Sequence, residues 1–313
     1  MALAEPGAEL YRAWRAFADG YEEPRALVGE VWLDDPERFA RYLRPDEMHN
    51  AFNFDFMTQP WDAARLRASI AATLDSHRAV DALPTWALSN HDLTRPATRY
   101  GRADSSFSFG AKRFGLEHDP ALGLARARSA ALLAAALPGS LYVYQGDELG
   151  LGEVENLPLD ALQDPMHFRS GGTDPGRDGC RVPLPWTREG ASLGFAPDAA
   201  SARPWLPQPA EWSELSVEAQ SGEPGSTLEL YRAMLALRRR EPGFAGGFDW
   251  IDHPDPAVIA FRRDDLLCVV NTGDAPARLP EHTETLLVSA PLNGDALPGN
   301  AALPGNTAAW LRR

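Results

Sequence analysis

The stretch Thr85–Asp92 reads TWALSNHD, a run of apolar and small residues that ends in Asn-His-Asp. A continuous apolar run is typical of a buried parallel strand, and functional side chains gather at the carboxyl ends of such strands. The same pattern recurs in Ala26–Trp32, Asn50–Met57 and Ser140–Gly146. The sequence therefore predicts four buried strands with polar residues at their ends.

Helical patterns separate these strands. Asp62–His77 carries apolar residues three and four positions apart, which indicates a helix with one buried stripe. Asp35–Leu43 has a proline in its first turn, and Pro120–Leu137 is rich in alanine. A further amphipathic helix is expected at Ala8–Ala18. Strands that alternate with helices indicate βα units, so the fold class is α/β with a parallel sheet.

The second half of the chain has a different pattern. Residues 153–215 are dense in glycine and proline and predict a long loop region, whose tryptophans favour packing over disorder. A helix is expected at Thr227–Arg240. Short alternating runs then predict a small antiparallel β-domain: Phe248–Ile251, Val258–Arg262, Leu266–Asn271 and Thr285–Val288. Two similar segments, Asp295–Asn300 and Ala302–Asn306, are expected to be loops.

The amino-acid composition excludes several classes of binding partner and site. The 313 residues include 44 acidic and 30 basic side chains, a net charge of −14, which argues against nucleic acid and anionic membranes. Two cysteines far apart in sequence fit neither a disulfide framework nor a zinc site. The first twenty residues lack a signal-peptide pattern, and the longest apolar stretch, Ala130–Leu137, is too short for a membrane span. We expect a cytoplasmic protein.

Acidic residues end two of the predicted strands. Glu30 follows the first strand, and His91 and Asp92 end the third. A lone acid after a strand is more often structural, and a histidine beside an acid is usually a hydrogen-bonded pair. Two such sites in one α/β chain are more suggestive, because paired carboxylates, one protonated and one charged, cleave glycosidic bonds.

Four motifs in order resemble the α-amylase superfamily, glycoside hydrolase family 13, and specifically its α-glucosidases of the oligo-1,6-glucosidase type. Gly29–Trp32 (GEVW) is similar to the strand-five motif of that family, and Asn90–Arg95 (NHDLTR) to its strand-seven motif. Tyr144–Gly150 (YQGDELG) resembles the segment after strand eight, and Gly176–Trp186 (GRDGCRVPLPW) a loop of the α-glucosidase branch. The resemblance extends from Tyr11 to the end of the chain.

The resemblance assigns catalytic and substrate-binding roles. Glu30 is expected to be the general acid/base, with a pKa raised by burial or by a nearby carboxylate. Asp92 is expected to stay charged and stabilise the transition state. His91 and Arg95 are expected to bind the sugar, although an ordinary ion pair remains an alternative for Arg95.

Other side chains near these motifs are expected to be structural. Asp178 and Arg181 are more easily explained by pairing within their own loop than by substrate contact. The aromatic residues Trp32, Phe54 and Trp86 are expected in the core rather than as platforms for sugar.

One required group has no match in the sequence. The family's nucleophilic aspartate lies in a Gly-Phe-Arg-x-Asp pattern upstream of the general acid, and no such pattern precedes Glu30. The Asp-x-x-x-Asn-His motif and the first βα loop, where many members bind calcium, are also missing, so no nucleophile, metal or cofactor is expected. The resemblance thus implies strands five to eight of a (β/α)8 TIM barrel over residues 1–242, including 153–215, and an antiparallel β-sandwich domain over 243–313.

The functional expectation is a retaining α-glucosidase that acts on α-linked gluco-oligosaccharides or maltose-like substrates. Because the nucleophile is missing, the chain is expected to be a truncated form that is inactive alone. Its expected partners are a missing amino-terminal half or a second copy that associates through exposed barrel edges. Alternatives are one half of a split enzyme and a non-catalytic carbohydrate-binding or scaffold protein.

Overall fold

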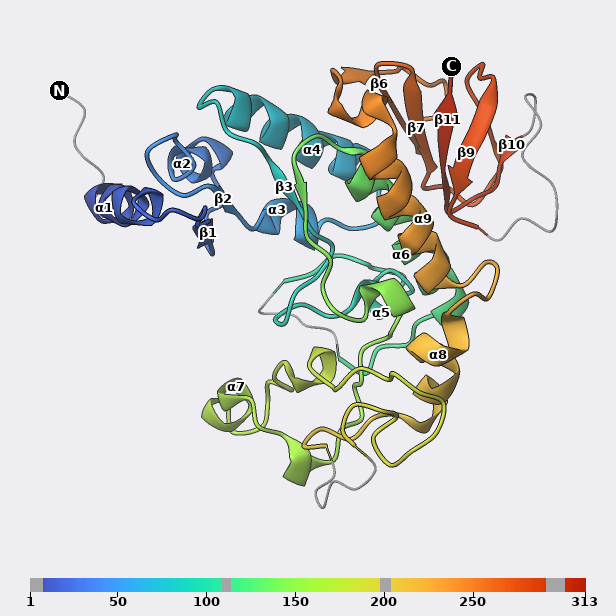
Figure 1. The fold of residues 1–313 in the computed structure, drawn as a ribbon. Helices are drawn as coiled ribbons and strands as arrows, with labels where there is room; N and C mark the ends of the chain where they lie inside the picture. The colour runs from blue at the N-terminus through green and yellow to red at the C-terminus, as the bar shows by residue number, and fades with distance from the viewer. Residues whose placement is uncertain (1–7, 109–113, 198–203, 291–301) are drawn as a thin grey trace.

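The computed structural model describes residues 8–108, 114–197, 204–290 and 302–313 (Figure 1). In its amino-terminal part, strand β1 (Val28–Gly29) pairs in parallel with β2 (Asn50–Ala51). Strand β3 (Thr85–Trp86) pairs in parallel with β4 (Ser140–Leu141). The four predicted strands are confirmed, but each is hydrogen-bonded as a ladder over only two residues.

Side chains join the two parallel pairs. Tyr142, just after β4, donates a hydrogen bond of 3.0 Å from its hydroxyl to Oδ1 of Asn50 in β2. The rings of Tyr142 and Phe52 also meet edge to face, with centroids 5.1 Å apart. The carboxyl-terminal ends of β2 and β4 therefore lie side by side.

Helices follow the strands as the sequence predicted, and polar caps fix where they start. The helices of this part are α2 (Pro36–Arg41), α3 (Phe54–Thr58), α4 (Ala63–Arg78), α5 (Pro96–Arg99) and α6 (Pro120–Ala136). Asp35, Asp62 and Asp119 each accept a hydrogen bond from a main-chain N–H in the first turn of α2, α4 and α6. Such caps satisfy donors that the helix leaves unpaired.

The prediction of one strand over Asn50–Met57 was wrong in its second half. The side chain of Asn53 accepts a hydrogen bond of 3.1 Å from the N–H of Phe56 and so begins the short helix α3. The Nδ2 group of Asn53 donates to Oγ1 of Thr73 in α4, 3.0 Å away. An apolar run alone does not distinguish a buried strand from a buried helical turn.

Helix α6 is the centre of the main core. Ala130–Leu137 are all buried, and α6 contacts both the carboxyl-terminal sheet and helix α9 (Thr227–Arg240). Most of these buried residues are alanines, and their small side chains allow the neighbouring elements to approach α6 closely. Figure 1 shows α6 and α9 side by side beneath the sheet.

The carboxyl-terminal part contains one antiparallel sheet of five strands in the order β5-β6-β7-β11-β9. The strands are β5 (Asp249–Trp250), β6 (Val258–Arg263), β7 (Leu266–Asn271), β9 (Glu284–Val288) and β11 (Thr307–Arg312). One face packs on α6, and the other packs under the pair β8 (Ala277–Arg278) and β10 (Ala302–Leu303). The second layer of the expected sandwich is thus a two-stranded ribbon.

The expectation of a closing loop at Ala302–Asn306 was wrong in part. Ala302–Leu303 form β10, and the chain then enters β11, a strand that was not predicted from the sequence. Strand β11 pairs with β7 on one side and β9 on the other, so it lies inside the sheet. The similar segment Asp295–Asn300 lies outside the described residues.

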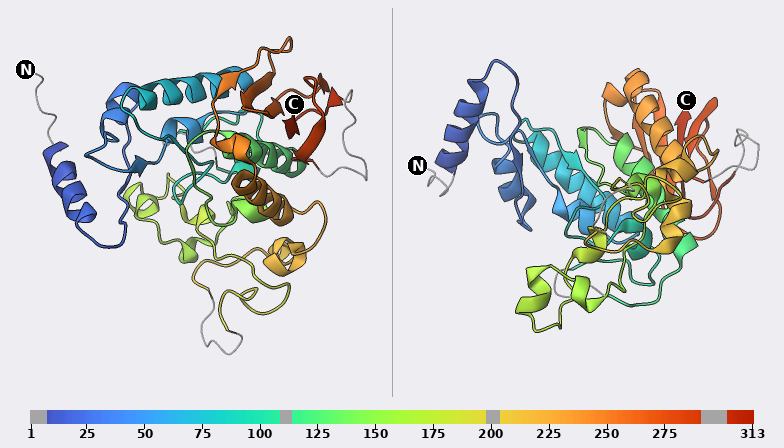
Figure 2. Two further views of the ribbon diagram at one scale, coloured as in Figure 1. Left: turned by 45° about the horizontal axis from the view of Figure 1, so that its top comes forward. Right: turned by 60° about the horizontal axis from the view of Figure 1, so that its bottom comes forward.

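Helix α1 (Ala8–Asp19) stands apart from the rest of the chain in both views of Figure 2. Its apolar residues Leu10, Trp14 and Phe17 are at least half exposed. Helix α1 is held by Arg12, whose Nη2 lies 3.0 Å from Oε1 of the buried Glu47. The expected helix is confirmed, but its contact with a core is made by Tyr11, which packs on the cluster of Phe39 and Leu43 and meets Tyr42 edge to face, and not by the three exposed residues.

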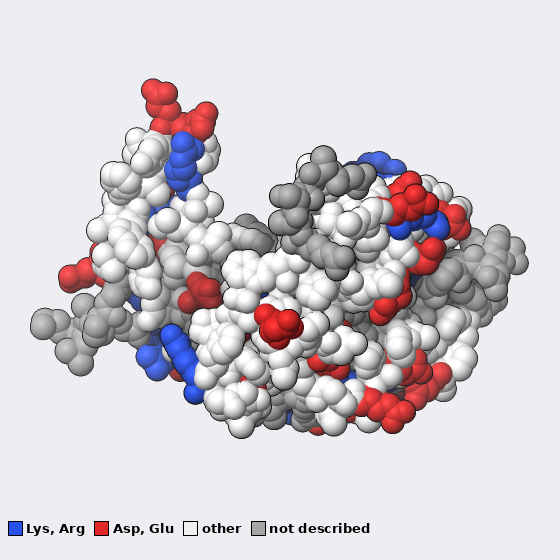
Figure 3. All heavy atoms as spheres, turned by 90° about the horizontal axis from the view of Figure 1, so that it is seen from below, with Lys and Arg blue, Asp and Glu red and all other residues white. Residues whose placement is uncertain are grey.

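The segment between β4 and α9 is mostly irregular, as predicted. Its described residues form four 3-10 turns and two short helices: η1 (Asp147–Leu149), η2 (Leu159–Ala161), α7 (Pro165–Arg169), η3 (Asp178–Cys180), η4 (Ala210–Leu215) and α8 (Val217–Gln220). The last 3-10 turn, η5 (Pro242–Ala245), follows α9. None of the described helices is long and apolar enough to cross a bilayer. Figure 3, a view from below, shows scattered acidic side chains in keeping with the net charge of −14.

Candidate active site

The segment after β3 is held in one conformation by Asn90. Its Oδ1 accepts hydrogen bonds from the N–H groups of Asp92, at 2.8 Å, and Leu93, at 3.2 Å. This Asx turn fixes the backbone around His91 and Asp92, in the segment that follows β3. The ladder of β3 ends at Trp86, so His91 and Asp92 follow the strand after four further residues, whereas the sequence predicted them as its last residues.

The carboxylate of Asp92 is held by two arginines. Its Oδ1 lies 2.8 Å from Nη1 of Arg177 and 3.0 Å from Nη2 of Arg181. Nε2 of His91 is 3.5 Å from the same oxygen. All of these contacts are made to Oδ1, so no described residue hydrogen-bonds to Oδ2. The side chain of Asp92 is 9% exposed, and that of His91 is 55% exposed.

Arg177 connects Asp92 to the long loop. Its Nε and Nη2 bond to the two carboxylate oxygens of the buried Asp164, at 2.6 and 3.0 Å. Burial alone raises the pKa of Asp164, but the hydrogen bonds from Arg177 and from the N–H of Met166 outweigh it and hold that pKa below its usual range. The pKa of Arg177 is raised, chiefly by its hydrogen bond to Asp164. The pair stays fully charged near neutral pH.

Asp178 and Arg181 have different roles in this loop. Oδ2 of Asp178 accepts hydrogen bonds from the N–H groups of Gln163, at 2.6 Å, and Asp164, at 2.9 Å, so the predicted pairing within the loop is confirmed. For Arg181 that prediction was wrong. Its guanidinium bonds to Asp92 and, through Nε at 2.8 Å, to the carbonyl oxygen of His91.

Arg95 is completely buried and contacts main-chain carbonyl groups. Its Nη1 donates to the carbonyl of Gln145 at 2.9 Å, and its Nη2 to that of Cys180 at 2.8 Å. Nη1 also lies 3.9 Å from Oδ1 of Asp147. A Cβ on Gly146, which has φ +96, would lie 2.6 Å from Nη1, so this approach requires glycine. The expected sugar contact by Arg95 does not fit this geometry, which matches the ion-pair alternative.

Two acidic residues next to Arg95 were not singled out from the sequence. Burial is the largest influence on both: it raises the pKa of Asp147 to about 6 and that of Glu153 to about 7. Oε2 of Glu153 accepts a hydrogen bond of 2.9 Å from the N–H of Arg95, and the hydroxyl of Ser89 donates to the carboxylate of Asp147, with both of its oxygens within 2.9 Å. In the sequence, only the position of Asp147 within the motif Tyr144–Gly150 could have indicated a functional role for it. No sequence pattern indicated such a role for Glu153.

Glu30 lies at the end of β1 and is exposed. The burial expected around its carboxyl group is therefore not found among the described residues. Nε1 of Trp32 lies 3.4 Å from Oε1 of Glu30, and the indole of Trp32 stacks on Phe54 with ring centroids 3.3 Å apart. Trp32 is 44% exposed, so its expected place in the core was wrong, whereas Phe54 and Trp86 are buried as predicted.

The structure brings His91 and Asp92 together with Arg177 and Arg181, but it gives Glu30 no contact with them. Arg177 was missed because it lies 85 residues from Asp92 in a loop without periodic pattern. In the part of the chain that the structure describes, no group of three acidic, histidine or cysteine side chains is placed to hold a metal ion. Both cysteines are buried free thiols.

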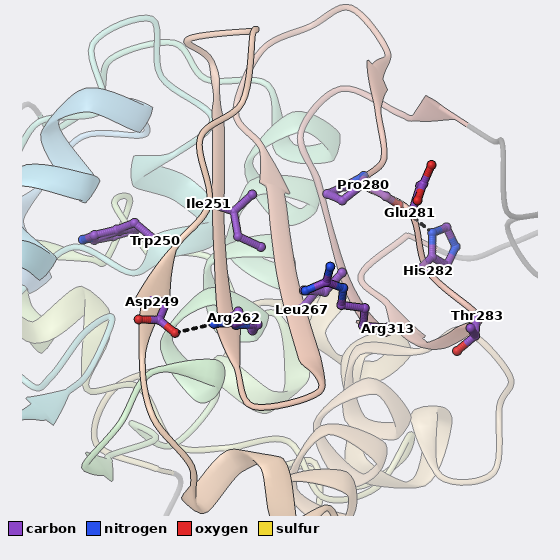
Figure 4. Close-up of a pocket in the computed structure, with 10 residues that line it drawn as sticks. All are labelled: Asp249, Trp250, Ile251, Arg262, Leu267, Pro280, Glu281, His282, Thr283 and Arg313. Atoms are coloured by element: carbon purple, nitrogen blue, oxygen red, sulfur yellow. Dashed lines mark hydrogen bonds and ion pairs between the residues drawn. The ribbon is translucent and has the colours of Figure 1, made fainter.

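A large hollow of about 1100 Å³ lies on the carboxyl-terminal sheet (Figure 4). Ile251 and Leu267 form part of its wall, and Arg262 is paired with Asp249 at 2.7 Å. None of the predicted site residues line this hollow. It is therefore separate from the strand-end cluster.

The comparisons with known proteins agree with the motifs. Residues 5–247 match the family model described as alpha amylase, catalytic domain. A probable alpha-glucosidase of Rhizobium meliloti (strain 1021) is 31% identical over 281 residues, which cover 86% of this chain and 46% of that protein. The oligo-1,6-glucosidase of Parageobacillus thermoglucosidasius is 24% identical over 306 residues, covering 84% of this chain and 50% of the relative.

Solved structures show the same relationship. The alpha-glucosyl transfer enzyme XgtA superposes with a TM-score of 0.77 at 30% identity, over 99% of this chain and 55% of that chain. The chain thus spans about half the length of the proteins that it matches.

Proposed function

Because the chain belongs to the α-amylase family, glycoside hydrolase family 13, we propose that it carries the general acid/base and the transition-state stabiliser of a retaining α-glucosidase. A relative named probable alpha-glucosidase and one named oligo-1,6-glucosidase support glycosidase chemistry and an α-linked gluco-oligosaccharide substrate. The parallel pairs β1–β2 and β3–β4 would be strands five to eight of the family's (β/α)8 barrel. Their order along the chain and the helices between them support this assignment.

The observation that carries the proposal is the position of the Asp92 carboxylate. Both arginines bind Oδ1, so they fix the orientation of Asp92, while no described residue hydrogen-bonds to Oδ2. A charged carboxylate beside the sugar ring stabilises the positive charge of an oxocarbenium-like transition state. The exposed His91, next to it, can donate a hydrogen bond to a sugar hydroxyl.

Glu30 would act as the general acid and base. In the first step of retaining hydrolysis it gives a proton to the glycosidic oxygen while a second carboxylate attacks the anomeric carbon. In the second step Glu30 takes a proton from the water that releases the sugar. An acid with this role is usually partly buried, so residues beyond the described ones would have to cover the exposed Glu30.

The second carboxylate is the group that residues 1–313 lack. No Gly-Phe-Arg-x-Asp pattern occurs before Glu30. We infer that these residues alone do not catalyse the covalent step and that further polypeptide, on the same or a second chain, supplies the nucleophile. A second candidate function, sugar binding without catalysis, needs only the free Oδ2 of Asp92 and the exposed His91.

Hydrolysis of an aryl α-glucoside and of maltose tests the proposal. We expect no turnover by residues 1–313 alone, and turnover after addition of the amino-terminal half of the Rhizobium relative's catalytic domain. Glu30→Gln should abolish that turnover, whereas Glu37→Gln, an exposed residue of α2, should not.

Two results would change this conclusion. Turnover by residues 1–313 alone, lost in Glu30→Gln, would show that the nucleophile lies within them. Sugar binding that depends on Asp92, without turnover in any combination, would favour the binding function.

A further inference from the structure

A second cavity, of about 530 Å³, lies between helix α6, the start of α9 and Ser289, which follows β9. The volume is within the range of ligand sites in proteins, roughly 300–1,000 Å³. Five buried polar residues line it: Arg128, Gln220, Thr227, Ser289 and Asn306. None of the predicted site residues line this cavity, so it is distinct from the candidate active site.

Arg128 brings a buried positive charge to the cavity. The residue is 7% exposed; its Nε donates to the carbonyl oxygen of Ser289 at 2.7 Å, and its Nη1 donates to Oγ1 of Thr227 at 3.0 Å. Burial lowers the pKa of Arg128, and the opposing influence comes from Tyr231. Because burial raises the pKa of Tyr231 well above its ordinary value, that hydroxyl is uncharged near neutral pH. The guanidinium therefore has no counter-charge among the described residues.

Other buried arginines have charged or more numerous partners. Arg102 pairs with Glu155, and Arg263 donates to four main-chain carbonyl groups. Arg128 has one carbonyl group and one hydroxyl, and no described residue accepts a hydrogen bond from its Nη2. Because Nη2 lacks a partner and yet is not fully enclosed by protein, it faces the open space of the cavity that Arg128 lines. A buried guanidinium with so few acceptors points to an acceptor that the cavity receives.

Thr227 adds two further donors beside this guanidinium. As the first residue of α9, it has a main-chain N–H without a partner inside the helix. Side chains accept from the next two N–H groups, those of Leu228 and Glu229, but no described residue accepts from that of Thr227. The hydroxyl of Thr227 accepts from Arg128 and still has its own hydrogen to donate, again without a described acceptor. Three donors on two contacting residues thus lack an acceptor, at the positive end of the α9 dipole.

The charges around the cavity favour a singly charged anion. Among the described lining residues, Arg128 is the only charged one that is buried, and one negative charge balances it. The other charged residues of the lining are exposed: Arg188 and Glu214, which pair at 2.9 Å, and Glu223. The two exposed carboxylates repel a dianion such as phosphate more than a monoanion. A neutral occupant would leave Arg128 without a counter-charge.

Much of the remaining wall is apolar, and it is larger than a bare ion needs. It includes Leu124, Leu149, Leu215 and Ala125. A chloride ion would leave this surface against water, whereas hydrocarbon attached to the anion removes it from water. A guanidinium also matches the geometry of a carboxylate. A carboxylate on a short aliphatic chain therefore suits both the donors and the apolar wall.

We propose that this cavity binds a small aliphatic monocarboxylate, whose carboxylate accepts hydrogen bonds from Nη2 of Arg128 and from Thr227. Its hydrocarbon chain lies along Leu124, Leu149 and Leu215. The site requires neither catalysis nor the proposed α-glucosidase chemistry. Because Arg128 and Thr227 belong to α6 and α9, an occupant connects two helices of the main core, and binding should stabilise the folded chain.

Titration of residues 1–313 with sodium hexanoate at constant ionic strength, followed by calorimetry and by thermal unfolding, tests the proposal. Hexanoate should bind and raise the unfolding temperature. Hexanamide, which has nearly the same shape without the charge, should not bind. Acetate, which lacks the longer chain, and inorganic phosphate should both bind more weakly than hexanoate.

Matched variants locate the binding. Arg128→Met keeps an unbranched side chain but removes the guanidinium, and we expect it to weaken hexanoate binding by roughly tenfold or more. Arg239→Met, at an exposed position of α9 that does not line the cavity, removes the same charge and should bind hexanoate as the original chain does. Thr227→Val removes one hydroxyl donor and should weaken binding to a smaller extent. It decides the question if Arg128→Met fails to fold.

Four results would overturn the inference. The first is the absence of hexanoate binding by the unmodified chain. The second is undiminished binding by folded Arg128→Met or, if that variant does not fold, by Thr227→Val, because the carboxylate would then lie on another basic residue. The third is equal binding of hexanamide and hexanoate, which would show that the charge is not recognised. The fourth is tighter binding of phosphate than of hexanoate.

Discussion

Arg177 lies 2.8 Å from Asp92 through Nη1 and thereby connects two segments that are 85 residues apart in sequence. The other edge of the same guanidinium bonds to both oxygens of Asp164. Three charges thus form one chain of ion pairs, which Arg181 extends at Asp92. The long loop is held on the strand end by these contacts, and the orientation of Asp92 depends on them.

Arg177→Met should destabilise the protein. The change leaves the buried Asp164 without its counter-charge, and breaking a fully buried pair costs about 3–5 kcal/mol. Because Arg177 itself keeps about a quarter of its side chain exposed, we expect a loss nearer to 2 kcal/mol. Urea unfolding near neutral pH measures it.

Arg169→Met, an exposed residue of α7 in the same loop, is the matched control and should change little. The stabilisation by Asp164 is also pH-dependent. Its folded pKa is lowered, so its contribution is present above the unfolded value of about 3.9 and is lost as the pH falls below it. Equal stability of Arg177→Met and the original chain at neutral pH would contradict this account.

Glu153 should make the protein less stable as the pH rises through neutrality. Burial raises its folded pKa to about 7 from an ordinary value of 4.5, so the folded state favours the protonated form. This contribution is complete below the unfolded pKa and is lost as the pH rises through the folded pKa. Asp147, with its pKa raised to about 6, acts in the same direction.

Glu153→Gln should remove most of this dependence. The glutamine oxygen can still accept the hydrogen bond from the N–H of Arg95, but it does not ionise. We expect the variant to gain on the order of 2–3 kcal/mol at about pH 8 and little near pH 5. Thermal unfolding at both pH values measures this, with Asp160→Asn, at an exposed site, as control. A parallel pH profile for Glu153→Gln and the original chain would show that Glu153 is not the titrating group.

The sequence predicted best where periodicity and a clear stop occur together. Helix α9 has the expected bounds, because its apolar stripe is followed directly by Pro242, and β7 likewise matches Leu266–Asn271. The position of Asp92 after a strand followed from the apolar run before it. These features are determined by residues that are close in sequence, so a sequence pattern can predict them.

Contacts between distant segments could not be predicted in this way. Nothing near Arg177 in sequence indicates that it bonds to Asp92, and nothing near Arg181 indicates that it leaves its own loop for the same oxygen. The burial of Arg95 and the exposure of Trp32 are likewise set by segments that pack from elsewhere in the chain. For Arg95 the sequence left two alternatives open, and its complete burial in the structure favours the ion pair.

Arg95→Met tests which alternative holds. The variant removes the donor to the carbonyl of Gln145, leaves the carbonyl of Cys180 with the Tyr144 hydroxyl alone, and takes the nearby cation from Asp147. We expect a loss of about 3 kcal/mol in the free energy of unfolding. Arg38→Met, at an exposed site in α2, should lose little. Unchanged stability together with weaker sugar binding would instead identify Arg95 as a sugar ligand.

Substitution of Trp310 tests the importance of β11, the strand that was not predicted from the sequence. Its indole is 1% exposed, packs on Phe244 with ring centroids 4.6 Å apart, and donates a hydrogen bond of 3.1 Å to the carbonyl of Leu132 in α6. Trp310→Ala opens a cavity between the sheet and α6, and such truncations cost about 3–5 kcal/mol.

Trp310→Phe separates the two contributions of that side chain. The ring is kept but the hydrogen bond to Leu132 is lost, so we expect a smaller loss of about 1–2 kcal/mol. Trp205→Ala, which removes an indole that is 71% exposed, should stay within about 0.5 kcal/mol of the original chain. Urea unfolding ranks the three variants. If Trp310→Ala proves as stable as Trp205→Ala, the sheet does not depend on packing against α6, because the side chain that joins them would then contribute nothing measurable.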